Sequence, residues 1–188
     1  MLKPQRSCRQ TLCQSWVIPG HLPVIWSSPL SFHISDLVLY SRTGQQKTIS
    51  FQDGRLNIVT GKSKTGKSAL LWIIDYCLGA NTPRVPAGPV RDRVAWYGLV
   101  LRGERRTVFV ARRSPRSFEG HQTDAYVDSG HNLEIPLYDD LRATTNVEGL
   151  RSVLTEFCGL SANLQAEDSS RHQYQATIRH ALLFCFLD

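Results

Sequence analysis

The residues of this sequence best suited to chemistry lie in one short stretch, GKSKTGKS at positions 61–68, which matches the pattern G-x-x-x-x-G-K-[ST] in full. Its glycines allow backbone angles at which consecutive N–H groups point into one concavity and can surround a phosphate. In such a loop the lysine, here Lys67, reaches the β- and γ-phosphates as the catalytic residue, while the hydroxyl of Ser68 coordinates Mg²⁺. The pattern therefore predicts a site for ATP and Mg²⁺. The expected binding residues are Gly61, Lys62, Ser63, Lys64, Thr65, Gly66, Lys67 and Ser68.

A phosphate-binding loop of this kind has to follow a strand and open a helix. Before it, Leu56 to Thr60 is apolar and β-branched enough to be predicted as a strand. After it, Ser68 to Leu78 is apolar nearly all round, which predicts a buried helix that ends at Gly79. The dipole of this helix would add to the anion site at its N-terminal end. Because both neighbours are in place, we interpret the loop as a phosphate site and not as a solvated turn.

The remaining chain is predicted to form short strands and two further helices. The expected strands cover residues 32–40, 47–51, 94–101, 107–112, 125–128 and 133–135, in addition to 56–60. Gly44 marks the turn between the first two strands. The strands at 94–101 and 107–112 are expected to form an antiparallel hairpin. Thr145-Asn146 is expected to cap a helix that reaches Phe157, and a last helix covers residues 174–186. Residues 81–90 are expected to be a proline-rich loop.

Hydrolysis of ATP requires more than the loop. An acid at the end of a neighbouring strand has to hold the Mg²⁺ water, and a second group has to orient the attacking water. One candidate run is present, LEIPLYDD, which ends in Asp139 and Asp140. Pro136 would interrupt a central strand, so we favour a surface turn for this run. The sequence therefore predicts how ATP is held, but not how it is cleaved.

With 188 residues and 41% hydrophobic residues, the chain is expected to form one domain, residues 31–188, after an irregular extension, residues 1–30. The extension is basic and free of acids, as in a transit peptide. Its four prolines and its lack of an amphipathic period favour a disordered segment instead. No stretch approaches the ~18 to 20 apolar residues of a membrane span, so no membrane partner is expected.

Charge and cysteine content point to polyanionic partners and a reducing compartment. The formal net charge is +6, and six arginines but one acid lie between Arg102 and Arg116. This arginine cluster is interpreted either as an anion-binding surface, with DNA as a candidate partner, or as charge that protects a strand edge. The five cysteines are odd in number and form no C-x-x-C pair, which favours free buried thiols in the cytoplasm over disulfides or a zinc site.

From Phe32 to Asp188 the chain resembles the N-terminal lobe of an SMC-like, SbcC-type ATPase head of the ABC class. The matching segments are FHISDLVLYS, KTISF, DGRLNIVTGKSKTGKSALLWIIDYCLG, VPAGPVRDRVAWYGLVL and TIRHALLFCFLD. The resemblance implies an α/β fold of the P-loop NTPase type. Its sheet would be mixed, with an antiparallel hairpin subdomain packed beside the helix that follows the Walker A loop, which is Gly61 to Ser68 here.

Such heads bind ATP and Mg²⁺, dimerise head to head and act on DNA ends or invading DNA, in repair, processing or defence. Members continue into a glutamine-containing loop, a coiled coil and a second lobe with signature and Walker B motifs. This sequence has Leu187 where that glutamine is expected, and an uncharged apolar run from Ala181 to Leu187. We therefore expect a second lobe, from further residues or from another chain in a homodimer, to complete the ATPase. The 188 residues alone are expected to hydrolyse ATP negligibly.

Two other interpretations stay open at this point. A self-contained P-loop kinase or GTPase would usually begin at the strand before the loop and carry a lid, whereas two additional strands come first here. A truncated, non-catalytic fragment would bind nucleotide or DNA passively. Phosphoryl transfer to any acceptor by the isolated chain would favour the kinase or GTPase. Steady ATP turnover that Lys67→Ala abolishes would refute the expectation of negligible hydrolysis.

Overall fold

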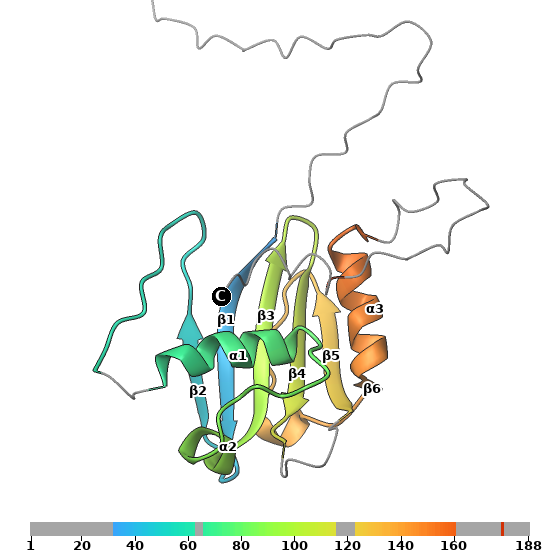
Figure 1. Cartoon of the computed structure of the whole chain (residues 1–188). Coiled ribbons are helices and arrows are strands. Elements are labelled where there is room, and N and C mark those ends of the chain that lie inside the picture. The colour runs from blue at the N-terminus through green and yellow to red at the C-terminus, as the bar shows by residue number, and fades with distance from the viewer. Residues whose placement is uncertain (1–31, 63–65, 116–122, 161–177, 179–188) are drawn as a thin grey trace, which may run out of the picture.

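The computed structural model describes residues 32–62, 66–115, 123–160 and residue 178, which form a mixed α/β fold (Figure 1). Six strands make one sheet in the order β2-β1-β3-β4-β5-β6. The strands are β1 (Phe32–Ser41), β2 (Gln46–Ser50), β3 (Val94–Gly103), β4 (Thr107–Arg113), β5 (Asp124–Gly130) and β6 (Thr145–Asn146). The helices are α1 (Lys67–Cys77), α2 (Pro89–Arg93) and α3 (Val147–Phe157), with one 3-10 turn at Tyr138–Asp140.

The sheet is antiparallel between all neighbouring strands of the described residues, so the mixed sheet expected from the sequence is wrong. Short turns explain the pairing of β1 with β2 and of β3 with β4, because antiparallel strands need only a few residues between them. Gly44 takes a positive φ of 80° between β1 and β2. Between β3 and β4, the N–H of Gly103 donates to the carbonyl oxygen of Arg106. The expected hairpin is thereby confirmed.

The prediction of a strand is wrong for two segments, because neither of them has a neighbouring strand to pair with. Leu56 to Thr60 forms no strand and lies outside the sheet, because the chain leaves β2 at Ser50 and arches away from it (Figure 1). Residues 133–135 pair with no strand and instead cover one face of the sheet. Strand propensity reflects packing in a pleated surface, which neither segment obtains. Within the expected loop 81–90, Pro89 and Val90 begin the short helix α2.

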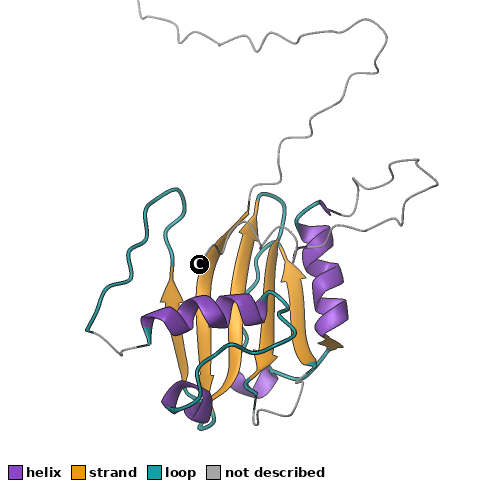
Figure 2. Ribbon diagram, in the orientation of Figure 1, coloured by secondary structure: helices purple, strands orange, loops and turns teal. Residues whose placement is uncertain are grey.

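Helices α1 and α3 pack on the same face of the sheet and bury the larger part of the core there (Figure 2). Ile73 and Ile74 of α1 and Leu150 and Leu154 of α3 belong to one cluster with strand residues such as Leu99. Asn146 caps α3 as expected, since its Oδ1 accepts a hydrogen bond from the N–H of Gly149. Of the expected last helix, Ile178 alone is described; it is helical and buried in this core.

The opposite face of the sheet is covered by the segment 131–141 and by no helix of the described residues longer than one turn. Its core contains Val38, Trp96, Phe109 and Leu141. The hydroxyl of Tyr40 donates to the carbonyl oxygen of Pro136 over 2.8 Å, which ties this segment to β1. Burial raises the pKa of Tyr40 well above its usual value, so this hydroxyl stays a donor over the physiological range.

The described residues include no helix with the length and apolar character needed to cross a bilayer. The extension at residues 1–30, and most of the expected helix at 174–186, lie outside the residues that the structure describes.

Gly98 of β3 allows two aromatic rings to meet on the face that the segment 131–141 covers. A Cβ atom at residue 98 would lie 2.8 Å from Cζ of Phe109 and 3.3 Å from Cε2 of Tyr40. We expect Gly98→Ala to lower the free energy of unfolding by about 1–3 kcal/mol, because overpacking forces these rings apart. Urea unfolding measures the change.

The matched control for this prediction is Gly130→Ala in β5, where the nearest contact of a new Cβ is 3.9 Å, with Leu133. This variant is expected to unfold at nearly the wild-type urea concentration. Equal stabilities of the two variants would contradict the packing account of Gly98.

Candidate phosphate-binding site

Helix α1 begins directly at the loop, as the sequence predicts for a phosphate site. Gly66 precedes it in the left-handed conformation, with φ 86° and ψ 15°, and Lys67 is its first residue. No side chain caps this helix end, and no acid lies in its first turn. The first N–H groups of a helix have no partner within the helix, and together with the helix dipole they favour an anion. Ser68 is exposed at the same end, where its hydroxyl can reach a metal ion bound to a phosphate.

Lys67 folds back over the loop that precedes it. Its Nζ donates hydrogen bonds to the carbonyl oxygens of Gly61, at 2.9 Å, and Lys62, at 2.6 Å. The structure thus brings together the first two and the last three residues of the expected site, while Ser63, Lys64 and Thr65 lie outside the described residues. A positive charge held at the mouth of a glycine loop is suited to a phosphate, which would accept from the same ammonium group.

The inner face of α1 is fixed against the sheet by apolar and aromatic side chains. Cys77 is fully buried, and its Sγ donates to the carbonyl oxygen of Tyr97 over 3.4 Å. Burial raises the pKa of the Cys77 thiol to about 12, and that of Tyr76 to about 12 as well. A neutral buried thiol is no nucleophile, so Cys77 is structural. Free thiols were expected, and Cys77 and Cys158 are both free.

The end of α1 is held by a buried arginine that sequence reasoning assigned to a surface. Arg112 is 1% exposed, and its Nη1 donates to the carbonyl oxygens of Tyr76 (2.8 Å) and Ala80 (2.7 Å). Its guanidinium also lies 3.8 Å from the centre of the Tyr76 ring. The missed signal is its position in β4, two residues beyond Val110 on the same buried face of the sheet.

The expected arginine cluster between Arg102 and Arg116 is therefore not one surface. Arg102 and Arg105 are exposed at the β3–β4 turn, and Arg113 lies at the far end of β4, next to Asp124 at 3.8 Å. Arg116 lies outside the described residues. Because the buried Arg112 cannot meet DNA, the expectation of a single anion-binding patch over this range is wrong.

Asp139 and Asp140 are exposed in the 3-10 turn, which confirms the surface turn favoured from the sequence. They belong to the segment that covers the face of the sheet opposite α1. The sheet therefore separates them from Ser68, and they are not placed to bind a metal ion together with that residue. Over the part of the chain that the structure describes, no group of three or more His, Cys, Asp or Glu side chains could hold a metal.

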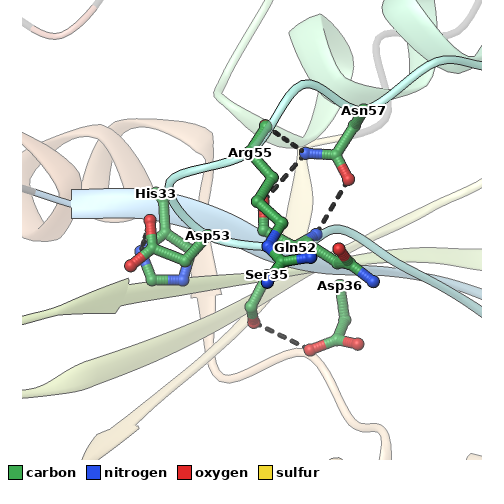
Figure 3. Close-up of polar contacts among 7 residues, drawn as sticks. All are labelled: His33, Ser35, Asp36, Gln52, Asp53, Arg55 and Asn57. Carbon is green, nitrogen blue, oxygen red and sulfur yellow. Dashed lines mark hydrogen bonds and ion pairs between the residues drawn. The ribbon is translucent and has the colours of Figure 1, made fainter.

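The segment that leads to the loop is organised by Asn57, which sequence reasoning did not single out (Figure 3). Its Oδ1 accepts from the N–H of Gln52 at 2.8 Å, and its Nδ2 donates to the carbonyl oxygens of Gln52 and Arg55. The side chain of Asn57 thus closes the turn around Gly54 by hydrogen bonds to the main chain on both sides of it. The local signal for this turn is the Asp53-Gly54 pair, followed by an Asn whose amide can hydrogen-bond the nearby main chain.

Beyond this turn, apolar side chains point into solvent. Leu56 is 85% exposed, Ile58 71% and Val59 49%, and Leu71 on the outer side of α1 is 54% exposed. Three of these four residues lie in the segment that was expected to be a strand. Exposed apolar patches on a protein surface commonly mark sites of interaction with another protein segment.

We expect Asn57→Ala to loosen the turn at residues 52–57, because three hydrogen bonds of its side chain are lost. The initial rate of tryptic cleavage after Arg55 is expected to rise several-fold. Gln52→Ala is the control, since residue 52 contributes only main-chain atoms to the turn. Equal cleavage rates in wild type and Asn57→Ala would show that the side chain does not order this segment.

Comparisons with protein-family models, with curated proteins and with solved structures give no match to this chain. The strand expected before the loop, at residues 56–60, does not form among the described residues. The interpretation of the site therefore depends on the loop residues, on the helix that they open and on the contacts of Lys67.

Proposed function

We propose that this chain binds Mg-ATP through the loop Gly61 to Ser68. The observation that carries the proposal is the position of Lys67: it opens α1, and its ammonium group is bonded to two carbonyl oxygens at the start of the loop. The phosphates would be bound by Lys67 and by the uncapped N–H groups of α1, and Mg²⁺ by the hydroxyl of Ser68. The charge of the nucleotide suits the net charge of +6.

We further propose that the chain works as the N-terminal lobe of an SMC-like ATPase in DNA repair, processing or defence. The exposed apolar side chains Leu56, Ile58 and Val59 support this proposal, because they follow β2 in a segment of strand composition with no strand beside it. A second lobe, or the second head of a homodimer, would add a strand there and cover Leu71. The same lobe would supply the acid for hydrolysis, since Asp139 and Asp140 lie on the opposite face of the sheet.

The proposed contact with DNA involves fewer arginines than the six that the sequence places between Arg102 and Arg116. Of the described arginines in the expected cluster, Arg102 and Arg105 are exposed and lie together at the β3–β4 turn. Phosphate contacts of this kind would contribute affinity without sequence preference.

We expect Lys67→Ala to weaken the binding of Mg-ATP by about 10- to 100-fold, which is the loss of one or two hydrogen bonds from a charged donor. Isothermal titration calorimetry measures the dissociation constant. Lys47→Ala in β2 removes an equally charged, exposed side chain that is not part of the loop, and this variant is expected to bind like wild type. Unaltered affinity in Lys67→Ala would refute the proposed nucleotide site.

The exposed apolar segment is expected to make the isolated chain self-associate as its concentration rises, because no second lobe covers it. The double variant Leu56→Gln, Ile58→Gln should shift sedimentation-velocity profiles toward the monomer. Leu137→Gln is the control, since Leu137 is 68% exposed but lies in the segment on the opposite face. The docking surface at residues 56–59 is contradicted if the control and the double variant behave alike.

A further inference from the structure

Three arginines from three elements surround the end of α1, and we call them the arginine collar. The collar consists of Arg91 in α2, Arg112 in β4 and Arg151 in α3. All three donate hydrogen bonds to main-chain carbonyl oxygens between residues 76 and 85. Carbonyl groups at the end of a helix have no partner within it and carry partial negative charge. Arg112 donates to such a carbonyl group, that of Tyr76, and the other contacts of the collar hold the chain just after the helix, at Gly79, Ala80 and Val85.

Arg151 makes the most specific contact of the collar. Its Nε and Nη2 both donate to the carbonyl oxygen of Gly79, at 2.9 and 2.6 Å, and Nη2 also donates to Oδ1 of Asn81. Gly79 has a φ of 93°, and a Cβ atom there would lie 2.9 Å from Cγ of Arg151. Two independent constraints therefore favour glycine at residue 79: its positive φ and the close approach of the Arg151 side chain.

Helix α1 connects this contact to the phosphate loop. Its 11 residues correspond to a rod of about 16 Å, at the usual rise per residue. The buried end carries Gly79 and the collar, whereas the other end carries Lys67 and Ser68, without a side-chain cap. A change in the tilt of the rod at the collar moves Lys67 and Ser68. Binding groups have to be held within about 0.5 Å of the productive geometry, so such a movement costs affinity.

We propose that Arg151 is a positioning residue for nucleotide binding: it holds the C-terminal end of α1 and thereby places Lys67 and Ser68 at the other end. The inference rests on the proposed function of the loop. Arg151 acts through Gly79 and α1, and not by contact with the nucleotide. Because coupling between two sites is reciprocal, a nucleotide bound at Lys67 also stabilises the contact between Arg151 and Gly79.

The test uses the whole 188-residue chain with three variants: Arg151→Gln, Arg151→Lys and Arg106→Gln. Arg106→Gln is the matched control, because Arg106 also holds α3, through an exposed pair with Glu156 at 3.2 Å. Calorimetric titration with Mg-ADP and with Mg-ATP gives the dissociation constants. Urea unfolding reports stability, and amide hydrogen exchange reports on the N–H groups of Gly79 and Ala80, which close the end of α1.

We expect Arg151→Gln to bind both nucleotides about tenfold more weakly, while Arg106→Gln binds like wild type. Arg151→Lys should lose about threefold, because an ammonium can still donate to the carbonyl oxygen of Gly79 but lacks the paired Nε and Nη2 donors of the guanidinium. Exchange at Gly79 and Ala80 should be faster in Arg151→Gln, and it should slow in wild type when Mg-ADP is bound. These amide signals do not require ATP turnover.

Wild-type affinity in a folded Arg151→Gln variant would overturn the inference and leave the proposed nucleotide site standing, even if the urea midpoint fell. Absence of binding in the wild-type chain would overturn the proposed site and the inference with it. If Arg151→Gln does not fold, Arg151→Lys decides: wild-type affinity contradicts the positioning role, and weaker binding with an unchanged urea midpoint supports it.

Discussion

The structure depends most on the charge of Arg112 inside the core. An ion that leaves water needs partners that compensate for its lost hydration. For Arg112 these include two carbonyl oxygens at the end of α1 and the face of the Tyr76 ring. The dipole of α1 has its negative end at the same place, which favours the positive charge further. Sheet, helix and the loop after the helix therefore meet at one guanidinium group from β4.

The two ends of α1 differ in the contacts that side chains make with their main-chain groups. At the buried end, arginines from three elements donate to main-chain carbonyl oxygens between Tyr76 and Val85. At the exposed end, Gly66 provides no side-chain cap, and the ammonium of Lys67 donates to the carbonyl oxygens of Gly61 and Lys62 in the loop. The exposed end of α1 therefore has no side-chain cap, whereas side chains from three elements hold the chain at the buried end.

The sequence sufficed for elements whose signals are local. Gly44, Gly79 and Asn146 mark turns and caps by their own conformational preferences, and they lie where these preferences predict. The glycine loop opens its helix at Lys67, as its spacing indicates. The prediction of a strand at residues 56–60 was wrong, because a strand needs a neighbouring strand and the local sequence pattern does not reveal whether one is present. The burial of Arg112 was missed for a related reason, since the register of β4 against β3 and α1 decides which side chains face the core.

The strand order β2-β1-β3-β4-β5-β6 also has a kinetic meaning. Each strand after β3 adds to the strand made just before it, and the longest step in the order joins β1 to β3, across the loop and α1. Sheets whose neighbours are close in sequence pay less loop-closure entropy and fold faster. During synthesis from the N-terminus, the sheet can therefore grow in one direction, toward β6, once β3 has emerged and paired with β1.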